Sequence, residues 1–467
     1  MQPAPQPCEP NTSASAWYLR WNWQRAALIG LVVVALVEGY IAVFRRDNDF
    51  LFHRNLGTAF LQGDPYGNSG EWYPVGRVML NAGLAALDYR LSRGVSYALA
   101  IASLVGCWMM WRRMAQATRP AERTVDVAAG VATCWLLLPF IVRDLDECGL
   151  QLFLLFFLTA GAWAVMRGRN MQGGCWLALA ATFKLTPLMC LPFLVWKRRW
   201  AAAAWMGLFI VGWNLAPAMF VGWETTLVCN QKWLACMRES AKVIDPAANA
   251  VEQAKPHNLS LAGTVGRYTQ TYPPGHSLYV DHPAFVQFGQ FTPLAAKRTY
   301  QGLLLLLGLF LAWHFRRRWL PPSVYDSSLP PCPYNSLTSA DAAPEWAIVC
   351  LLCALLSPVC WKQHLMVALP CLFLVLRCEL TSPHRTPWRI ASLIVIALTV
   401  YGARHGFVGQ SFSIVLLSYK VDTFAMLLLS VLLFTMPSSE MTKENTHTLA
   451  IHSSHKSPIQ LSKAQAA

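Results

Sequence analysis

The chain has 467 residues, of which 55% are hydrophobic and only 13% are charged. A soluble domain usually carries about 25% charged residues. Together with 20 Trp and several apolar runs of membrane-crossing length, this composition excludes an ordinary soluble protein and predicts a polytopic helical membrane protein. The net charge of +14 gathers in short clusters between the apolar runs, which is typical of a topology signal. The lipid bilayer is therefore an expected partner, and no nucleic acid is.

Residues 26–44 form the first apolar run, and Glu38 is its only charged residue. A helix of this length rises about 1.5 Å per residue and crosses about 30 Å, the thickness of the hydrocarbon core. Residues 1–25 are mostly polar and Pro-rich, so we expect a cytoplasmic N-terminal segment rather than a signal peptide. Residues 26–436 are expected to form one transmembrane domain. The Ser-, Thr- and Lys-rich residues 437–467 are expected to be a disordered cytoplasmic tail.

Five clusters of Arg and Lys lie between the apolar runs, and the positive-inside rule places all of them in the cytoplasm. They occupy residues 112–123, 167–169, 197–199, 316–318 and 377–389. Spans are then expected near 26–44, 94–111, 125–142, 149–166, 201–221, 299–315, 346–358, 364–377, 388–402 and 422–436, with a broken pair near 173–183 and 186–196. The segment 75–87 is too short to cross the membrane alone. The result is about twelve helical elements with both termini in the cytoplasm.

The same topology places most polar motifs on the extracytoplasmic face. That face receives the long loops 45–93 and 222–298 and the shorter segments 143–148, 358–363 and 403–421. The motifs are spread over more than 300 residues, so their shared side of the membrane is informative. The Pro- and Ser-rich segment 319–345 is expected to be a cytoplasmic linker.

Two carboxylates, Asp47 and Asp49, follow the first span directly, and Tyr73 lies later in the same loop. A carboxylate at the membrane surface can accept the proton of a sugar hydroxyl as that hydroxyl attacks. The alternative is that both acids are simply the solvated end of a helix.

Lys184 lies inside an apolar stretch that runs between two cytoplasmic clusters, so an even number of crossings must fit there. Two half-length helices broken near Pro187 satisfy this requirement, because Pro is tolerated at the start of a helix. A Lys at such a break is costly unless it is paired, so it is a functional candidate with a lipid phosphate as the partner. The alternatives are a structural pair with Glu38 and snorkelling to a surface.

Three further groups of polar residues belong to the extracytoplasmic side. Trp361 and His364 lie between two spans, where they suit stacking on a sugar and binding of a phosphate, or an ordinary interfacial belt. Asn258 and Arg267 lie in the long loop, and an Arg fork suits phosphate oxygens; an ordinary polar loop is the alternative. Residues 143–151 contain three acids, an Arg and a Gln that are either mutually paired or bind a metal or a sugar.

In chain order these motifs resemble glycosyltransferase family 87, membrane enzymes of the GT-C fold, over about residues 26–436. They are Asp-Phe after the first span, Gly-x-x-Tyr at 63–66 and Tyr-Pro, Gly and Gln at 149 and 151, Lys-x-Thr-Pro at 184–187, Asn-x-Ser-Leu at 258–261 followed by an Arg, and Ser-Pro-x-x-Trp-x-x-His at 357–364. The resemblance implies an all-α GT-C-type fold with about twelve transmembrane or re-entrant helices. It also implies a sugar, typically mannose, taken from a polyprenyl phosphate carrier on the outer face.

The resemblance also assigns roles to residues. Asp49 matches the family's proposed base, and Lys184 and His364 match its Lys-x-Thr-Pro and its closing His. The departures are Val75 in place of a second Pro, Leu150 between the Gly and the Gln, and Gln363 where His is frequent. The expected substrate-binding residues are Lys184, His364, Arg267, Asn258, Trp361, Tyr73, Asp47, Asp146 and Gln151.

The reaction that these assignments predict is an inverting transfer of a hexose to an acceptor hydroxyl, with Asp49 as the catalytic base and Asp47 as the alternative. Cations near the leaving phosphate would stabilise the transition state. No metal and no cofactor are expected. The expected partners are a polyprenyl-phosphate-linked sugar donor and a glycan or glycolipid acceptor, with the protein in a bacterial plasma membrane and its site facing outward. The alternative function is a lipid or glycan transporter or flippase, which a broken helix with a buried Lys also suits.

Overall fold

The computed structural model describes residues 21–44, 49–66, 73–118, 121–241, 257–270, 288–316, 342–382 and 386–436. Within these ranges the regular structure is helical, and the β pairing is limited to an isolated bridge between Gln270 and Phe291. The predicted all-α class is therefore confirmed. The predicted tail 437–467, residues 1–20 and most of the predicted linker lie outside the described residues. The last four residues of that linker belong to a helix, α17 (Ala342–Leu355).

In the described part of the chain, five helical segments are long and apolar enough to cross a membrane, or up to seven if two bent pairs each count as one span. The five are α1 (Trp21–Phe44), α4 (Tyr89–Thr118), α10 (Trp200–Leu215) with α11 (Ala218–Val221), α16 (Pro293–His314), and η6 (Lys362–Ala368) with α18 (Leu369–Thr381). Shorter apolar helices lie among them: α7 (Leu150–Met166), η3 (Thr186–Met189) with α9 (Cys190–Trp196), α17, and α19 (Pro387–Gly402). The chain is an integral membrane protein.

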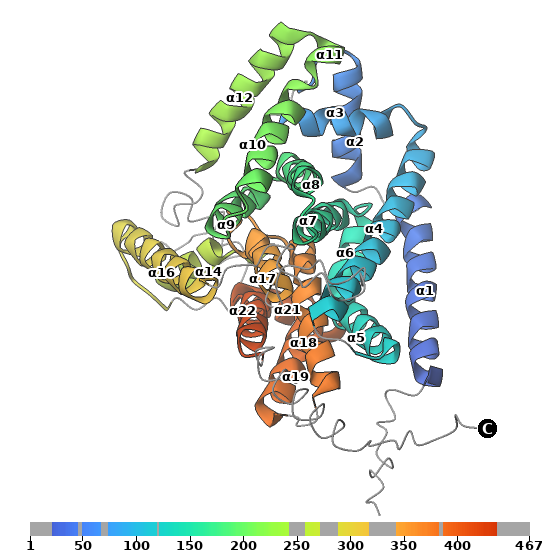
Figure 1. Cartoon of the computed structure of the whole chain (residues 1–467), viewed down its shortest axis with the longest axis vertical. Coiled ribbons are helices and arrows are strands. Elements are labelled where there is room, and N and C mark those ends of the chain that lie inside the picture. The colour runs from blue at the N-terminus through green and yellow to red at the C-terminus, as the bar shows by residue number, and fades with distance from the viewer. Residues whose placement is uncertain are drawn as a thin grey trace, which may run out of the picture.

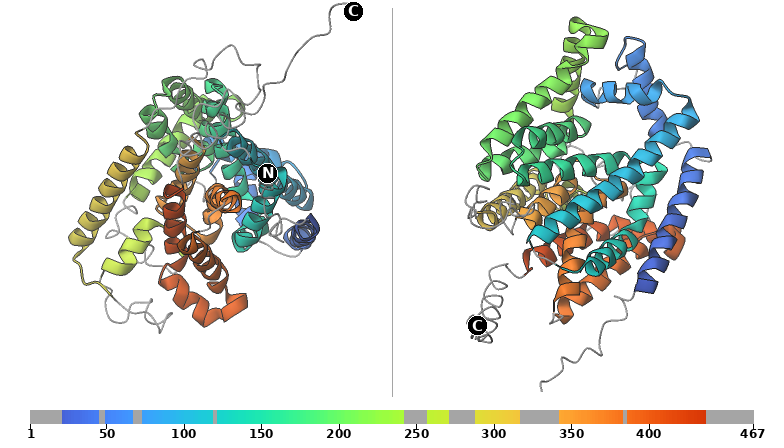
Figure 2. Two further views of the ribbon diagram at one scale, coloured as in Figure 1. Left: turned by 60° about the horizontal axis from the view of Figure 1, so that its bottom comes forward. Right: turned by 45° about the vertical axis from the view of Figure 1, so that its right-hand side comes forward.

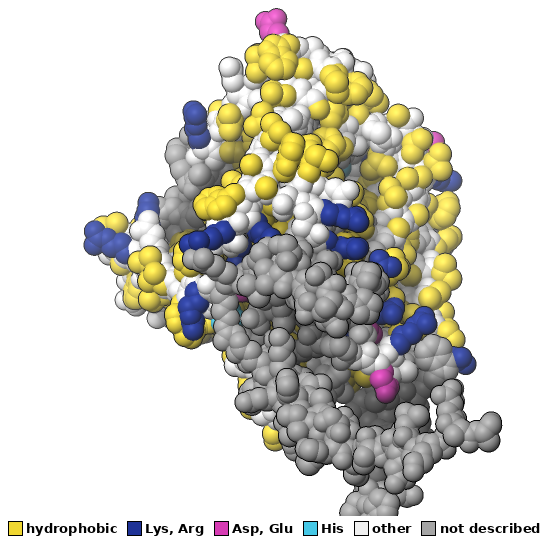
Figure 3. Space-filling view, in the orientation of Figure 1, with side chains coloured by type: hydrophobic (Ala, Val, Ile, Leu, Met, Phe, Trp, Pro, Cys, Tyr) yellow, Lys and Arg dark blue, Asp and Glu magenta, His cyan; other side chains and the backbone are white. Residues whose placement is uncertain are grey.

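The first span shows why a bilayer is needed to cover the molecule. Along α1, large apolar side chains are exposed, among them Ile29 at 63% and Leu36 at 69%. Figure 3 shows hydrophobic side chains along the edge of the molecule where Figure 1 places α1. Such a continuous apolar surface is favourable only against lipid or another apolar surface.

The protein core lies around α17, which Figure 1 shows in the middle of the molecule. The buried apolar residues of α17 belong to this core. One of them is Trp346, whose indole is fully buried. Helices α4, α7 and α18 and the 3-10 helix η6 all contact α17. The polar motif at 357–364, which overlaps η6, is therefore held against the buried core.

The span predicted for 125–142 is not a single helix. The structure has α5 (Arg123–Leu136) and α6 (Leu138–Asp146), which meet at an angle of 65°. Pro139 lies in the first turn of α6, and because Pro lacks the N–H that would bond the carbonyl four residues earlier and its ring clashes with that carbonyl, the helix is interrupted at Leu137. As a result, Arg143 to Asp146 form the last turn of a helix and not the loop that the sequence predicted.

The predicted outer loops are largely helical. They contain α2 (Asp49–Leu61), α3 (Val75–Ala85), α12 (Trp223–Ala241), α14 (Leu261–Thr269), α20 (His405–Val408) and α21 (Gln410–Ser418), which precedes α22 (Val421–Phe434) at an angle of 54°. Helices α2, α3, α11 and α12 lie together at one end of the molecule in Figures 1 and 2. With 11 residues, α3 is too short to span a bilayer, as predicted.

Several Arg and Lys of the predicted cytoplasmic clusters are paired with acids. Arg377 and Arg112 both contact Asp126, at 2.7 and 3.3 Å, and Lys197 contacts Glu345 at 2.6 Å. These pairs join helices that are distant in sequence, so residues of the clusters contribute to the packing of the bundle.

Candidate functional site

The helix break at Lys184 is present where the sequence predicted it. Helix α8 (Asn170–Phe183) ends one residue earlier, and Lys184 has an extended backbone with φ −154° and ψ 137°. The chain resumes in η3, which carries Pro187 in its first turn, where the missing N–H costs nothing. Lys184 is half-buried at this break.

Lys184 and His364 meet across 180 residues of sequence. The Lys184 Nζ lies 3.0 Å from the Nδ1 of His364. The same Nδ1 accepts the backbone N–H of Trp361 at 3.0 Å. Because Nδ1 faces two donors, it acts as an acceptor and the imidazole is the neutral Nε2–H tautomer. The sequence proposed both residues separately, and the structure brings them together.

Arg77, which the sequence analysis did not select, joins this pair from α3. Its Nη1 donates to the carbonyl of Phe183 at 2.7 Å, and its guanidinium lies 3.9 Å over the ring of Tyr73 and 4.6 Å over that of Phe183. Arg77 is 4% exposed, and its Nε has no hydrogen-bond partner among the described residues. We call Arg77, Lys184 and His364 the cation cluster, because the charges of Arg77 and Lys184 both act on His364.

The first outer loop reaches the cation cluster through aromatic contacts. The ring of His53 lies 5.3 Å from that of Tyr73, on which Arg77 stacks. Burial and the charge of Arg77 hold the pKa of His53 well below its usual range, so this imidazole is neutral. Burial also lowers the pKa of Arg77, but the neighbouring Tyr73 favours its charged form. The predicted site residue Tyr73 therefore contacts the cation cluster through its ring, which packs against Arg77.

The predicted base lies at the edge of what the structure describes. Asp47 is outside the described residues, and Asp49 is the first residue of α2, with its side chain not described. Its backbone position is one turn before His53 in the same helix.

Asn258 supports the turn that carries Trp361 and His364. Its Nδ2 donates to the carbonyl of Pro358 at 3.2 Å, and its Oδ1 accepts the N–H of Cys360 at 3.1 Å. The neighbouring Leu259 also pairs with Cys360, whose carbonyl accepts the Leu259 N–H at 2.7 Å. At 1% exposure, Asn258 holds the backbone of this turn in place.

Arg267 lies against a different part of the bundle from the cation cluster. Its Nε donates to the carbonyl of Ser418 at 2.9 Å, and its guanidinium lies 5.3 Å from the ring of Tyr419. Next to it, Lys420 donates to the carbonyl of Asn258 at 2.6 Å. Arg267 thus contacts the turn between α21 and α22.

The acidic segment 143–151 is held by internal pairs, the first of the alternatives that the sequence left open. Arg143 pairs with Glu147 at 2.8 Å, and Glu147 accepts the amide of Gln363 at 2.9 Å. Asp144 accepts the backbone N–H groups of Gln151 and Leu152 at 2.9 and 3.0 Å, so it caps the start of α7. The predicted site residue Asp146 is buried at the end of α6. Among the described residues, no group of three or more His, Cys, Asp or Glu has the arrangement of a metal site.

Fold and site together define a helical membrane protein with a cation cluster at a broken helix, near the segment that carries Asp49. The profile of glycosyltransferase family 87 matches residues 72–329, which is more than half of the chain. The chain therefore belongs to glycosyltransferase family 87, as the motif order predicted. The matched region includes Arg77 and Lys184 and ends before His364.

Two other comparisons complete this result. Among solved structures, the chain is similar to the crystal structure of ArnT from Cupriavidus metallidurans bound to undecaprenyl phosphate. The sequence identity is 14% and the TM-score is 0.31, with 95% of this chain and 83% of that chain covered. No curated protein sequence matches the chain.

Proposed function

We propose that the protein transfers a hexose from a polyprenyl phosphate carrier to an acceptor hydroxyl on the extracytoplasmic face of a bacterial plasma membrane. The observation that carries the proposal is the 3.0 Å contact between Lys184 and His364 at the helix break, with Arg77 beside it. A lipid-linked phosphate has its charge at the membrane boundary and its chain in the bilayer, and a cation cluster at a break in an apolar helix suits both parts.

In this reaction the acceptor oxygen attacks the anomeric carbon and the bond from that carbon to the phosphate oxygen breaks. The hydroxyl proton passes to Asp49, and the phosphate leaves with an additional negative charge. Lys184 and Arg77 stabilise that charge, and they do so more strongly in the transition state than in the ground state because the charge grows as the bond breaks.

His364 acts as a positioning residue in this mechanism. Its Nδ1 is fixed by the Trp361 amide, and it accepts one of the three N–H groups of Lys184. The ammonium is thereby oriented, and its remaining two N–H groups are available for phosphate oxygens. An ammonium held in this way loses less conformational entropy when the substrate binds.

Asp49 is supported as the base by its place in the chain. It opens α2 one turn before His53, and His53 contacts Tyr73, the ring on which Arg77 stacks. A base on this helix is therefore carried by an element that packs next to the phosphate site. Mannose is the sugar that family resemblance favours, and the acceptor is a glycan or glycolipid.

The direct test is transfer from radiolabelled polyprenyl phosphate mannose. Purified protein in lipid is incubated with this donor and a lipid extract of its own organism, in chelator, beside Asp49→Asn. We expect a labelled product from the wild type and a loss of at least about 100-fold in Asp49→Asn, the usual contribution of a general base. Equal transfer by Asp49→Asn would show that another group is the base, and Asp47→Asn is the next variant.

The same experiment separates the enzyme from a flippase. A flippase moves the labelled donor across the bilayer without chemical change, so the label would stay on the carrier. Label that crosses sealed vesicles but never leaves the polyprenyl phosphate, with wild-type protein and added acceptor, would contradict the transferase.

A further inference from the structure

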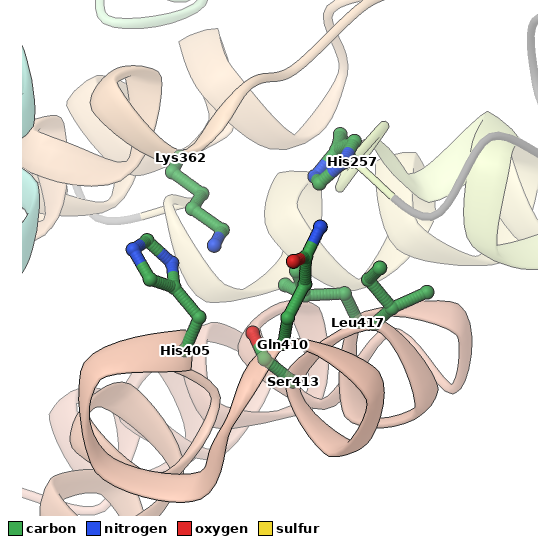
Figure 4. A pocket seen from close by; sticks show the side chains of 7 residues that line it. His257, Lys362, His405, Gln410, Ser413 and Leu417 are labelled. Carbon is green, nitrogen blue, oxygen red and sulfur yellow. The ribbon is translucent and has the colours of Figure 1, made fainter.

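A cavity with polar and apolar walls lies beside the start of η6. It has a volume of about 310 Å³ and is lined by His257, Lys362, His405, Gln410, Ser413, Ile414 and Leu417. Figure 4 shows the side chains of Lys362, His405, Gln410 and His257 pointing toward a common space. The walls come from the start of η6, from α20 and α21, and from the residue before the Asn258 turn.

The cavity combines donors with excess positive charge. Within the described residues, no hydrogen bond or ion pair involves the ammonium of Lys362. Of its charged neighbours, Arg404 is bound to Asp422 at 3.5 Å and Arg143 to Glu147 at 2.8 Å, so their charges are largely compensated. Among the described residues Lys362 makes no direct ion pair, and the acid whose charge acts on it, Asp422, is already bound to Arg404.

Three further polar side chains of the cavity can form directed hydrogen bonds with a bound group. The Ser413 hydroxyl donates to the carbonyl of Ala403 at 2.8 Å, which holds α21 against the end of α19 and leaves the hydroxyl oxygen as an acceptor. The side chains of His405 and Gln410 are exposed at the cavity and carry N–H groups. Ile414 and Leu417 lie on the same face of α21 as Gln410 and make that part of the wall apolar.

The cavity is next to the transfer site but distinct from it. Lys362 and His364 are two residues apart in η6, and His364 contacts Lys184 while Lys362 lines the cavity. A molecule that occupies the cavity is therefore close to the cation cluster without competing for Lys184. A volume near 310 Å³ is at the lower end of small-molecule sites and fits one sugar-sized unit rather than a lipid chain.

We propose that this cavity binds an anionic sugar-sized group, a phosphate or carboxylate carried on one hexose-like unit, and that this group belongs to the acceptor. Only the statement that the bound group belongs to the acceptor rests on the proposed function. Lys362 supplies the charge, His405 and Gln410 supply directed N–H groups, and Ile414 with Leu417 covers the apolar face of the ring. The transferase thus recognises an acidic acceptor beside the site where the neutral hydroxyl reacts.

Protection of Lys362 from chemical acylation tests the binding. Wild-type protein in phosphatidylcholine nanodiscs is treated with an amine-acylating reagent, and labelling of each Lys is followed by mass spectrometry. Three probes are compared: glucose 6-phosphate, glucuronate and glucose. We expect the two anionic probes to protect Lys362 at concentrations about tenfold lower than glucose does, because a charge-assisted hydrogen bond is stronger than a neutral one.

Two controls make the result specific. Lys232, an exposed Lys of α12, is labelled in the same sample and should not be protected by any probe. His405→Ala should weaken protection of Lys362 by glucose 6-phosphate by about threefold to tenfold while the protein remains folded. Protection by only one of the two anions identifies whether the group is a phosphate or a carboxylate.

Equal protection of Lys362 by glucose and glucose 6-phosphate, or no protection by either anion, overturns the proposal. The acylation assay measures binding and needs no sugar transfer, so its result does not depend on whether the proposed function is correct. Protected Lys362 in a protein without transfer activity would contradict the transferase and keep the cavity's anion site. Normal transfer activity with unprotected Lys362 would support the transferase and overturn the anion site in the cavity.

Discussion

At the scale of single residues, Arg77 links α3 to the helix break. It donates to the last carbonyl of α8, and its guanidinium lies between the rings of Tyr73 and Phe183. No local sequence signal predicts this role, because one Arg in a short amphipathic segment is usually solvated. The partner, Phe183, is 106 residues away, and a single sequence contains no information on that contact.

Arg77→Lys tests whether the fork of the guanidinium matters. A Lys keeps the charge but cannot bond the Phe183 carbonyl and a phosphate in the same planar geometry, so we expect affinity for polyprenyl phosphate to fall about tenfold. The matched control is Arg54→Lys, because Arg54 also bonds a helix-end carbonyl, that of Leu87, and lies 5.7 Å over a ring, that of Tyr89. Equal effects of the two substitutions on binding would remove Arg77 from the site.

His53 predicts a dependence of stability on pH. Burial and Arg77 hold its pKa in the folded protein well below the value of about 6.5 in the unfolded chain. The unfolded state therefore binds more protons between these two values, and stability is full above pH 6.5 and falls as the pH decreases below it. We expect His53→Gln to flatten the fall in unfolding temperature between about pH 6.5 and 5. An unchanged slope in this variant would show that other groups cause the acid sensitivity.

At the scale of elements, the sequence analysis predicted the break at Lys184 but not the bend at Leu137. The break follows from two cytoplasmic clusters that require an even number of crossings, together with Pro187, and the observed helix ends at Phe183 as expected. Pro139 gave an equally local signal for the bend. The apolar length of 125–142 favoured one span, and only the packing of α6 against η6 and α7 shows that the second part turns away.

The start of α7 depends on Gly149, which has φ +81°, a conformation that favours Gly. A Cβ at this position would overlap the Cβ of Ala100. We therefore expect Gly149→Ala to lower stability by about 2–4 kcal/mol, since backbone strain and overpacking add. Gly83→Ala in α3 is the matched control, because a Cβ there meets nothing within 4 Å and Ala favours a helix. Thermal unfolding in nanodiscs measures both, and a similar unfolding temperature for the two variants would contradict this account.

At the scale of the whole molecule, Asp126 joins three helices from distant parts of the chain. Its carboxylate accepts Arg377 of α18 at 2.7 Å, Arg112 of α4 at 3.3 Å and Gln116 of α4 at 2.6 Å. Asp126→Ala removes the carboxylate that pairs with buried Arg377 and with Arg112, so we expect a loss of about 3–5 kcal/mol. Glu122→Gln, at an exposed neighbouring position, should change stability by less than about 0.5 kcal/mol. Unfolding in urea or detergent compares the two, and a neutral Asp126→Ala would show that the network contributes little.

The class, the helix order and the family were predictable for the whole molecule because apolar length, positive clusters and motif order are properties of the sequence itself. The arrangement of the site was predictable only in part. Lys184 and His364 were selected separately, whereas their contact depends on the packing of η6 beside α17. Helices α2 and α12 in the outer loops were not predicted, because their apolar residues lack the length of a span.

Binding of polyprenyl phosphate, the proposed product, to Lys184 variants tests the central claim most directly. Equilibrium binding is measured in phosphatidylcholine nanodiscs for the wild type, Lys184→Gln and the matched surface control Lys232→Gln. We expect Lys184→Gln to bind about tenfold more weakly or worse, because it loses a charge-assisted hydrogen bond at the phosphate, and Lys232→Gln to bind like the wild type. Unchanged binding by a folded Lys184→Gln protein would contradict the assignment of the cation cluster as the phosphate site.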